Sequence, residues 1–244
     1  MEKANLRKTN GDAPAPADGR VLLHTCCAPC SVACVDSLRA EGLAPTAFWF
    51  NPNIHPFTEY RARRDTLRAY AADIGLPLVE RDAYGLRPFL AAVGGAVDAR
   101  CPLCYAMRLD AAAEYAAQNG FSAFSTTLLI SPYQQHALLV EAGEAAAAAH
   151  GVAFLYRDFR PLFRDGQQRA RALGLYMQKY CGCIFSEEDR YIRNRPLKKP
   201  PVQINPKPVN PKKLARMEKA AANAAARAEH ERLAAAAAGE EPGK

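Results

Sequence analysis

The chain has 244 residues, and 49% of them are hydrophobic, which is enough for one buried core with terminal extensions. It has no apolar run of about 18 residues, and its N-terminal stretch lacks the apolar core of a secretion signal, so we expect a cytoplasmic protein with no membrane association. The net charge of +7 is concentrated near the C-terminus, so the rest of the chain is close to neutral.

In chain order, residues 1–19 are rich in Pro, Ala and Asp and are predicted to form a disordered leader. Strand and helix signals then alternate through residues 20–195, the predicted catalytic domain. Strands are predicted at residues 20–25, 46–50, 76–80, 121–126 and 152–156. Helices are predicted at residues 29–41, 57–73, 86–93, 105–119, 132–150 and 166–177. The alternation predicts an α/β fold with a doubly wound, mostly parallel Rossmann-like sheet, helices on both faces and a metal site at the carboxyl ends of the strands.

The composition changes from residue 196, where KKPPVQINPKPVNPKK cannot pack a core. We therefore predict that residues 196–244 form a basic Pro/Lys-rich linker and an alanine-rich, helix-prone tail that is marginal as an isolated helix. Between Arg190 and Lys219 there are ten Lys or Arg and a single acid, Glu218. Such a segment favours a nucleic-acid partner, although a solvated basic tail is the alternative.

Seven of the eight cysteines fall into three tight clusters. The clusters are Cys26-Cys27-x-x-Cys30, Cys101-x-x-Cys104 and Cys181-x-Cys183. Because they lie far apart in the sequence, a shared site must be assembled by the fold. The first cluster directly follows the first strand, where doubly wound sheets place their ligands.

Three kinds of chemistry fit these thiols. Two CxxC-like pairs suit a structural zinc site but leave three cysteines without a role. Adjacent cysteines suit an iron–sulfur cluster, which leaves three thiols for a second metal or a redox dithiol. Thiol–disulfide chemistry without a metal is the third alternative. A disulfide within Cys181-Gly182-Cys183 would be strained and easily reduced, although two metal ligands on one turn explain the spacing equally well.

Several segments together resemble the QueH-type, cobalamin-independent epoxyqueuosine reductases. They are LLHTCCAPCS (22–31), FWFNPNIHPFTEYRARRD (48–65), RCPLCYAMRLDAAAEYAAQNGFSAFSTTLLISPYQQH (100–136), GVAFLYRDFRP (151–161) and GLYMQKYCGCIFS (174–186). The resemblance implies a two-electron deoxygenation of epoxyqueuosine to queuosine at the wobble position of tRNA, the last step of queuosine biosynthesis. It also implies an external electron donor, which the sequence does not identify, and we expect a monomer.

The resemblance further implies a [4Fe-4S] cluster and a redox-active pair, Cys181 and Cys183. The implied cluster ligands are Cys26, Cys27, Cys101 and Cys104. We place Cys30 near an additional mononuclear iron, with Asp158 as an oxygen ligand or proton donor there. The alternative for Asp158 is a capping or salt-bridged carboxylate at a strand end.

Candidate contacts to the modified nucleoside come from two polar segments. They are Asn51, Asn53 and His55 after the second strand, and Tyr133 and Gln134 before a helix. A stiff structural loop and helix N-terminal packing explain these segments nearly as well. The rival to the enzyme as a whole is a zinc-stapled basic RNA-binding protein without redox activity.

Overall fold

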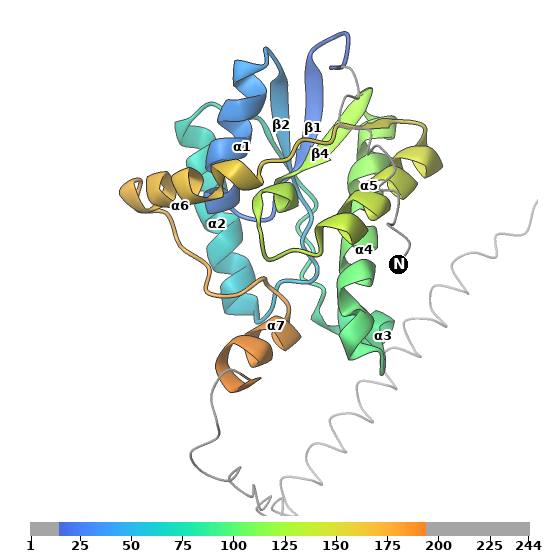
Figure 1. Ribbon diagram of the computed structural model, residues 1–244, viewed down its shortest axis with the longest axis vertical. Helices are drawn as coiled ribbons and strands as arrows, with labels where there is room; N and C mark the ends of the chain where they lie inside the picture. Colours follow the sequence, from blue (N-terminus) through green and yellow to red (C-terminus); the bar gives the residue numbers. More distant parts are fainter. Residues whose placement is uncertain (1–14, 194–244) are drawn as a thin grey trace, which may run out of the picture. The chain divides into compact units, whose positions relative to one another are not determined.

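Five parallel strands form the centre of the molecule (Figure 1), in the order β3-β2-β1-β4-β5. They are β1 (Arg20–His24), β2 (Ala44–Trp49), β3 (Leu78–Glu80), β4 (Ala123–Thr126) and β5 (Ala153–Phe154). The computed structural model describes residues 15–193, all within the unit Met1–Pro196. The predicted tail at 196–244 and most of the predicted leader lie outside the described residues, so the three-part division of the chain stays a prediction.

Helices cover both faces of this sheet, as Figure 1 shows. The helices are α1 (Ala28–Ala40), α2 (Phe57–Asp73), α3 (Leu86–Val93), α4 (Arg100–Gln118), α5 (His136–His150), α6 (Phe163–Ala172) and α7 (Ile184–Glu188). Helices α3 and α7 are short. Helix α1 contacts α2 and α6 on one face, and α4 packs along α5 on the other. The predicted doubly wound α/β fold is therefore confirmed.

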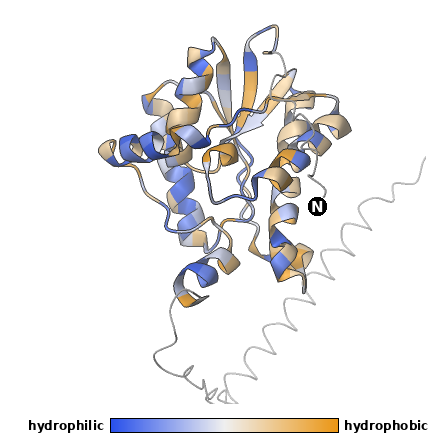
Figure 2. Ribbon diagram, viewed as in Figure 1, coloured by the Kyte–Doolittle hydropathy of each residue, from blue (hydrophilic) through white to orange (hydrophobic). Residues whose placement is uncertain are grey.

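The central strands are apolar because both of their faces are covered. Val21, Leu22 and Leu23 of β1 are fully buried, and every residue of β4 is buried. In Figure 2 the hydrophobic residues gather on the sheet, whereas hydrophilic residues are prominent on α2 and α6. No helix among the described residues is long and apolar enough to cross a bilayer.

The direction of the winding reverses at β1. The chain passes from β1 to β2 and β3 on one side, then returns to β4 and β5 on the other. Loops that leave β1 and β4 therefore diverge to opposite faces and leave a crevice at the carboxyl ends of these strands. The Cys26 N–H donates to Thr127 Oγ1 at 3.1 Å across this point, which joins the loop after β1 to the loop after β4.

Two predicted helices differ from the observed ones in a way that affects the site. The helix predicted at 105–119 begins at Arg100, so the second cysteine pair lies in its first turn, where Pro102 is tolerated because the first backbone N–H groups have no helical partner. The helix predicted at 166–177 runs from Phe163 to Ala172 and ends before Gly174, whose φ is 67°. The chain from there to Cys183 is irregular.

Candidate metal centre and substrate cavity

The first cysteine cluster forms a compact group of three buried thiols. Cys27 is the N-cap residue of α1, and Pro29 lies in the first turn, where its fixed φ suits the start of a helix. The Sγ atoms of Cys26, Cys27 and Cys30 all lie within 4.8 Å of one another. Within residues 15–193 no other group of three potential metal ligands is as close. Three soft ligands at a switch point therefore favour a thiophilic metal or an iron–sulfur cluster.

One negative charge is stabilised among these three thiols. Hydrogen bonds from the Cys27 and Cys30 thiols hold the pKa of Cys26 well below its usual range, and Arg108 and Thr127 add to this effect. Thr127 Oγ1 lies 3.4 Å from Cys26 Sγ. Burial and the Cys26 thiol raise the pKa of Cys27, and the thiols of Cys26 and Cys27 raise the pKa of Cys30. The lowered pKa of Cys26 favours its thiolate form, which is the form that binds metal.

Arg108 on α4 is a buried cation whose hydrogen-bond partners include no carboxylate. Its guanidinium donates to Asn51 Oδ1 at 2.7 Å and lies 3.7 Å from Cys104 Sγ. It forms no ion pair with a carboxylate within the described part of the chain. Because a buried charge without a counter-ion is unfavourable, Arg108 fits a site whose thiols carry negative charge. This donor set and its buried cation fit an anionic metal–thiolate group.

His24 is held neutral beside the same arginine. Burial, aided by the charge of Arg108, lowers the pKa of His24 to about 3. The ring Nε2 lies 3.4 Å from Arg108 Nε and 3.3 Å from the carbonyl oxygen of Phe50, and Nδ1 lies 2.9 Å from Thr126 Oγ1. His24 therefore connects β1, β4 and α4 as a satisfied core histidine and offers no proton for chemistry near neutral pH.

The second cysteine pair lies on the first turn of α4. Cys104 is buried, and burial raises the pKa of its thiol to about 12, against the influence of Arg108. Cys101 is half-buried, and burial raises the pKa of its thiol, as do the neighbouring thiols of Cys181 and Cys183. Cys104 and Cys183 pack in one apolar cluster with Phe89. The fold thus brings the second and third cysteine clusters together.

Buried Arg63 fixes the third cysteine cluster. Its guanidinium is ion-paired with Glu59 at 2.7 Å and donates to the carbonyl oxygens of Cys181 at 2.8 Å and Tyr180 at 3.0 Å. Gly182 between the two cysteines has a φ of 152°, and a Cβ atom there would lie 3.2 Å from Ile54 Cγ1. Only glycine therefore fits this turn without strain.

The loop after β2 is hydrogen-bonded to the turn at Gly182. The backbone N–H of His55 donates to Gly182 O at 2.8 Å, and its Nδ1 accepts from Ile184 N at 3.4 Å. Asn51 is held by Thr25 and Arg108, and Asn53 lies beside Gly182. All three predicted contact residues are buried and are absent from the lining of the cavity described below. Their contacts favour the structural alternative.

Two glutamine amides face the sulfur atoms. Gln134 Nε2 donates to Cys181 Sγ at 3.3 Å, and its Oε1 accepts from Tyr105 at 2.7 Å, so the amide orientation is fixed. Gln178 Nε2 lies 3.6 Å from Cys30 Sγ. Tyr133, by contrast, is 84% exposed, with its ring edge-to-face against Phe163 at 5.9 Å between centroids. Gln134 and Tyr133 both line the cavity described below, and their contact with a nucleoside stays a prediction.

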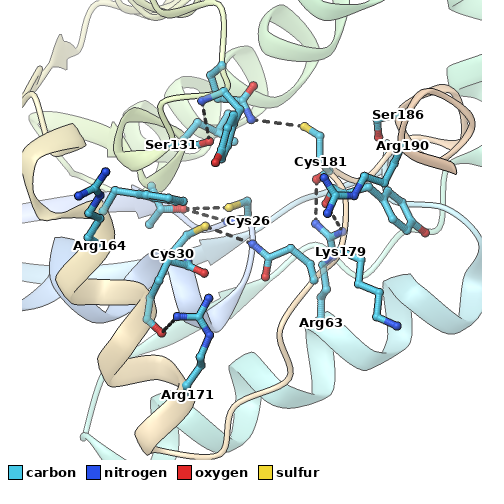
Figure 3. Close-up of a pocket in the computed structure, with 18 of the residues that line it drawn as sticks. Cys26, Cys30, Arg63, Ser131, Arg164, Arg171, Lys179, Cys181, Ser186 and Arg190 are labelled. Carbon is cyan, nitrogen blue, oxygen red and sulfur yellow. Dashed lines mark hydrogen bonds between the residues drawn. The ribbon is translucent and has the colours of Figure 1, made fainter. Parts of the chain in front are cut away.

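These groups line one cavity of about 990 Å³ at the carboxyl edge of the sheet. Three thiols reach it, those of Cys26, Cys30 and Cys181, whereas the other cysteines do not. In Figure 3, Cys26 and Cys30 lie between Arg164 and Arg171 on one side and Cys181 on the other. The size is at the upper end for a ligand pocket, which leaves room for more than one nucleoside.

Asp158 has other partners. Both of its carboxylate oxygens accept from the Arg160 side chain at 2.7 Å, and Oδ1 also accepts from the Arg160 backbone. It is exposed and is not among the residues that line the cavity. Its role as an iron ligand stays a prediction, and its contacts favour the salt-bridged alternative.

The sequence reasoning missed three features of the site. It did not identify the buried position of Arg63, gave no role to Arg108, and overlooked the cavity wall that α6 forms. A signal for the last of these was present in the spacing of polar residues along one side of α6, Arg164, Gln167, Gln168 and Arg171.

The chain matches the family model of epoxyqueuosine reductase QueH over residues 21–189. It is 40% identical over 172 residues to the epoxyqueuosine reductase QueH of Dehalococcoides mccartyi. This match covers 70% of this chain and 94% of the relative. The QueH of Histophilus somni is 34% identical, with 70% and 73% covered. That of Thermotoga maritima is 33% identical, with 70% and 92% covered. The matched region holds every cysteine of the site, and the chain therefore belongs to the epoxyqueuosine reductase QueH family.

Proposed function

We propose that this protein reduces epoxyqueuosine to queuosine at the wobble position of tRNA, the last step of queuosine biosynthesis. The observation that carries the proposal is the cavity of about 990 Å³ in which Cys26, Cys30 and Cys181 face a common space. Thiols of two cysteine clusters from opposite ends of the domain reach the same substrate volume there. A zinc staple would need no such opening, since structural zinc sites are closed.

We assign the ligands of a [4Fe-4S] cluster to Cys26, Cys27, Cys101 and Cys104. The proximity of Cys26 and Cys27, with Sγ atoms 3.7 Å apart, supports the first half of this set. Arg108 supports the second half, because it contacts Cys104 and also lowers the pKa of Cys26. Cys30 lines the cavity beside Cys26, so its thiol is placed to hold an additional mononuclear iron that substrate can reach.

The reaction removes the epoxide oxygen and leaves an alkene, with two electrons and two protons consumed and one water released. Bound iron would supply electron transfer and an electrophilic position for the departing oxygen, which is a poor leaving group on its own. The Cys181 and Cys183 thiols supply the stoichiometric pair in this scheme. Their oxidation to a disulfide releases two electrons and two protons, and an external thiol or dithiol donor then reduces the disulfide.

Substrate contacts are assigned to Tyr133 and Gln134. The exposed ring of Tyr133 offers a stacking face for an extruded base, and Gln134 orients Cys181 from the same segment. Asn51, Asn53 and His55 act instead as supports of the turn at Gly182. Asp158 can bind the second iron only if Arg160 is displaced from its carboxylate.

A tRNA substrate places the reaction in the cytoplasm, and we keep the expectation of a monomer. The proposal is tested by measuring iron and acid-labile sulfide per chain in protein purified without oxygen, followed by turnover of epoxyqueuosine-containing tRNA. We expect about four sulfides, an excess of iron over sulfide, and conversion of the epoxide to the alkene detected by mass spectrometry of nucleosides. Zinc near one equivalent without sulfide would instead favour the alternative, a basic RNA-binding protein with a structural zinc site and no redox activity.

A further inference from the structure

Helix α6 presents a polar stripe to the cavity. Residues spaced three and four apart share one side of a helix, and four such residues line the cavity wall, Arg164, Gln167, Gln168 and Arg171. The opposite side of the helix is apolar and small. Ala170 is fully buried, and a Cβ atom at Gly166 would lie 3.1 Å from Ala33 Cβ of α1. The stripe is therefore held rigidly toward the cavity by close packing against α1.

The cations of this wall have no carboxylate partner. Arg164 and Arg171 of the stripe, and Lys179 beyond it, form no ion pair within residues 15–193. On the same helix Arg169 points elsewhere and pairs with Asp36 and Asp165. Asp189 contributes the only carboxylate among the lining residues, and it pairs with Arg100. The wall thus carries positive charge that no ion pair within the described part of the chain neutralises.

We infer that the cavity-facing stripe of α6 binds the phosphate backbone of the tRNA nucleotides next to the modified one, with Arg164 and Arg171 each contacting a phosphate. This inference rests on the proposed function. The two arginines are seven residues apart, which is about 10 Å along the helix axis, so they meet different phosphates. The amides of Gln167 and Gln168 lie between them and can donate to the ribose and phosphate oxygens.

The rim of the cavity beside the start of α6 favours RNA over an acidic protein as the occupant. Tyr133 is almost fully exposed at the rim and stands against Phe163, the first residue of α6. An aromatic platform beside a basic groove is the usual arrangement for a single-stranded nucleic acid. With the backbone held on α6, an extruded base reaches the space between Cys26, Cys30 and Cys181.

The experiment measures binding of an unmodified anticodon stem–loop RNA to the full chain over a range of salt concentrations. For single-stranded contacts each lost phosphate contact lowers the salt slope by about 0.7, which is about 5-fold in affinity between 1 M and 0.1 M salt. Arg164→Gln and Arg171→Gln should each show this loss, and the double variant about 25-fold at 0.1 M. Arg39→Gln is the matched control, because Arg39 lies in the last turn of α1, at the end of this helix opposite to the cysteine cluster.

Turnover separates this inference from the proposed function. In the double variant we expect KM for tRNA to rise by about the same factor as the binding constant, with kcat unchanged. Wild-type salt slopes in both arginine variants would overturn the role of α6 and leave the reductase assignment intact. Normal RNA binding combined with a weaker response to a protein electron donor would also overturn it, since the stripe would then be a protein-docking surface. Absence of epoxide reduction by the wild-type protein would instead reject the proposed function.

Discussion

Arg108 donates to the Sγ of Cys104 at 3.7 Å, from one turn further along α4. The same guanidinium lowers the pKa of Cys26 on the opposite side of the crevice. One buried cation thus acts on cysteines of two clusters that lie far apart in the sequence. In the proposed metal centre Arg108 is therefore expected to act as a positioning residue rather than as a group that contacts substrate.

We predict that Arg108→Met weakens cofactor retention by about 10–100-fold, the usual effect of removing an outer-shell partner. Loss of a cation and of a hydrogen bond near the sulfur atoms should also make the reduction potential of the cluster more negative. Iron and sulfide after chelator treatment, and a redox titration followed by electron paramagnetic resonance, measure the two effects. Arg108→Lys retains the charge and should retain more of the cluster. Wild-type retention and potential in Arg108→Met would contradict this role.

Cysteine variants distinguish the ligands of the cluster from those of the additional iron. Cys104→Ala should lower iron and sulfide together, whereas Cys30→Ala should lower iron and leave sulfide near its wild-type level. Cys34→Ala is the control, because Cys34 is fully buried on α1 and belongs to no cluster. It should keep both elements and cost about 1 kcal/mol of stability. Loss of sulfide in Cys30→Ala would move Cys30 into the ligand set of the cluster.

Gly182→Ala should disorder the turn that carries Cys181 and Cys183. The added Cβ atom would lie 3.2 Å from Ile54 Cγ1 and 3.5 Å from Arg63 Nη1. The φ of 152° at this position is also unfavourable for alanine. We expect a loss of about 1–3 kcal/mol in the free energy of unfolding, loss of turnover, and faster alkylation of the Cys183 thiol. Gly174→Ala shares a positive φ but meets nothing within 4 Å. It should leave turnover and thiol reactivity near wild type, and equal effects of the two variants would refute the proposed packing role.

Asp158→Asn tests whether this carboxylate binds metal or only Arg160. Hydrogen bonds from Arg160 hold the pKa of Asp158 below its ordinary value of 3.8. A lowered folded-state pKa contributes stability above the unfolded pKa, and this contribution is lost as the pH falls through the folded value. The stability difference between wild type and variant should therefore be present at neutral pH and shrink below about pH 4, with iron content unchanged. A loss of iron with unaltered pH dependence would establish Asp158 as a ligand.

The sequence predicted the order of strands and helices because apolar runs and turn residues mark them locally. The bounds of α2 and α3 agree with the prediction. The start of α4 at Arg100 was missed because a cysteine pair with an internal proline is more typical of a loop. Local preference did not reveal that the first turn of a helix accommodates this pattern.

The assignment of roles within the site depended on tertiary contacts that no local pattern encodes. Arg61, Arg63 and Arg64 look like one basic helix face, yet Arg63 is buried and Arg64 is paired with Asp82. Burial of Arg63 is made favourable by its ion pair with Glu59 and by the backbone carbonyls of Tyr180 and Cys181. Because these acceptors lie more than a hundred residues away, the orientation of this side chain cannot be predicted from α2 alone.

The dependence of Arg63 on the third cysteine cluster has a consequence for biogenesis. During synthesis, α1, α2 and α4 leave the ribosome before the segment at Tyr180 and Cys181 does, and until then Arg63 lacks the carbonyls that satisfy it. The turn that carries Cys181 and Cys183 is therefore tied to α2 only when this last segment has been made. We expect loading of the proposed metal centre to follow completion of this domain, and chains truncated before Cys183 to retain iron poorly.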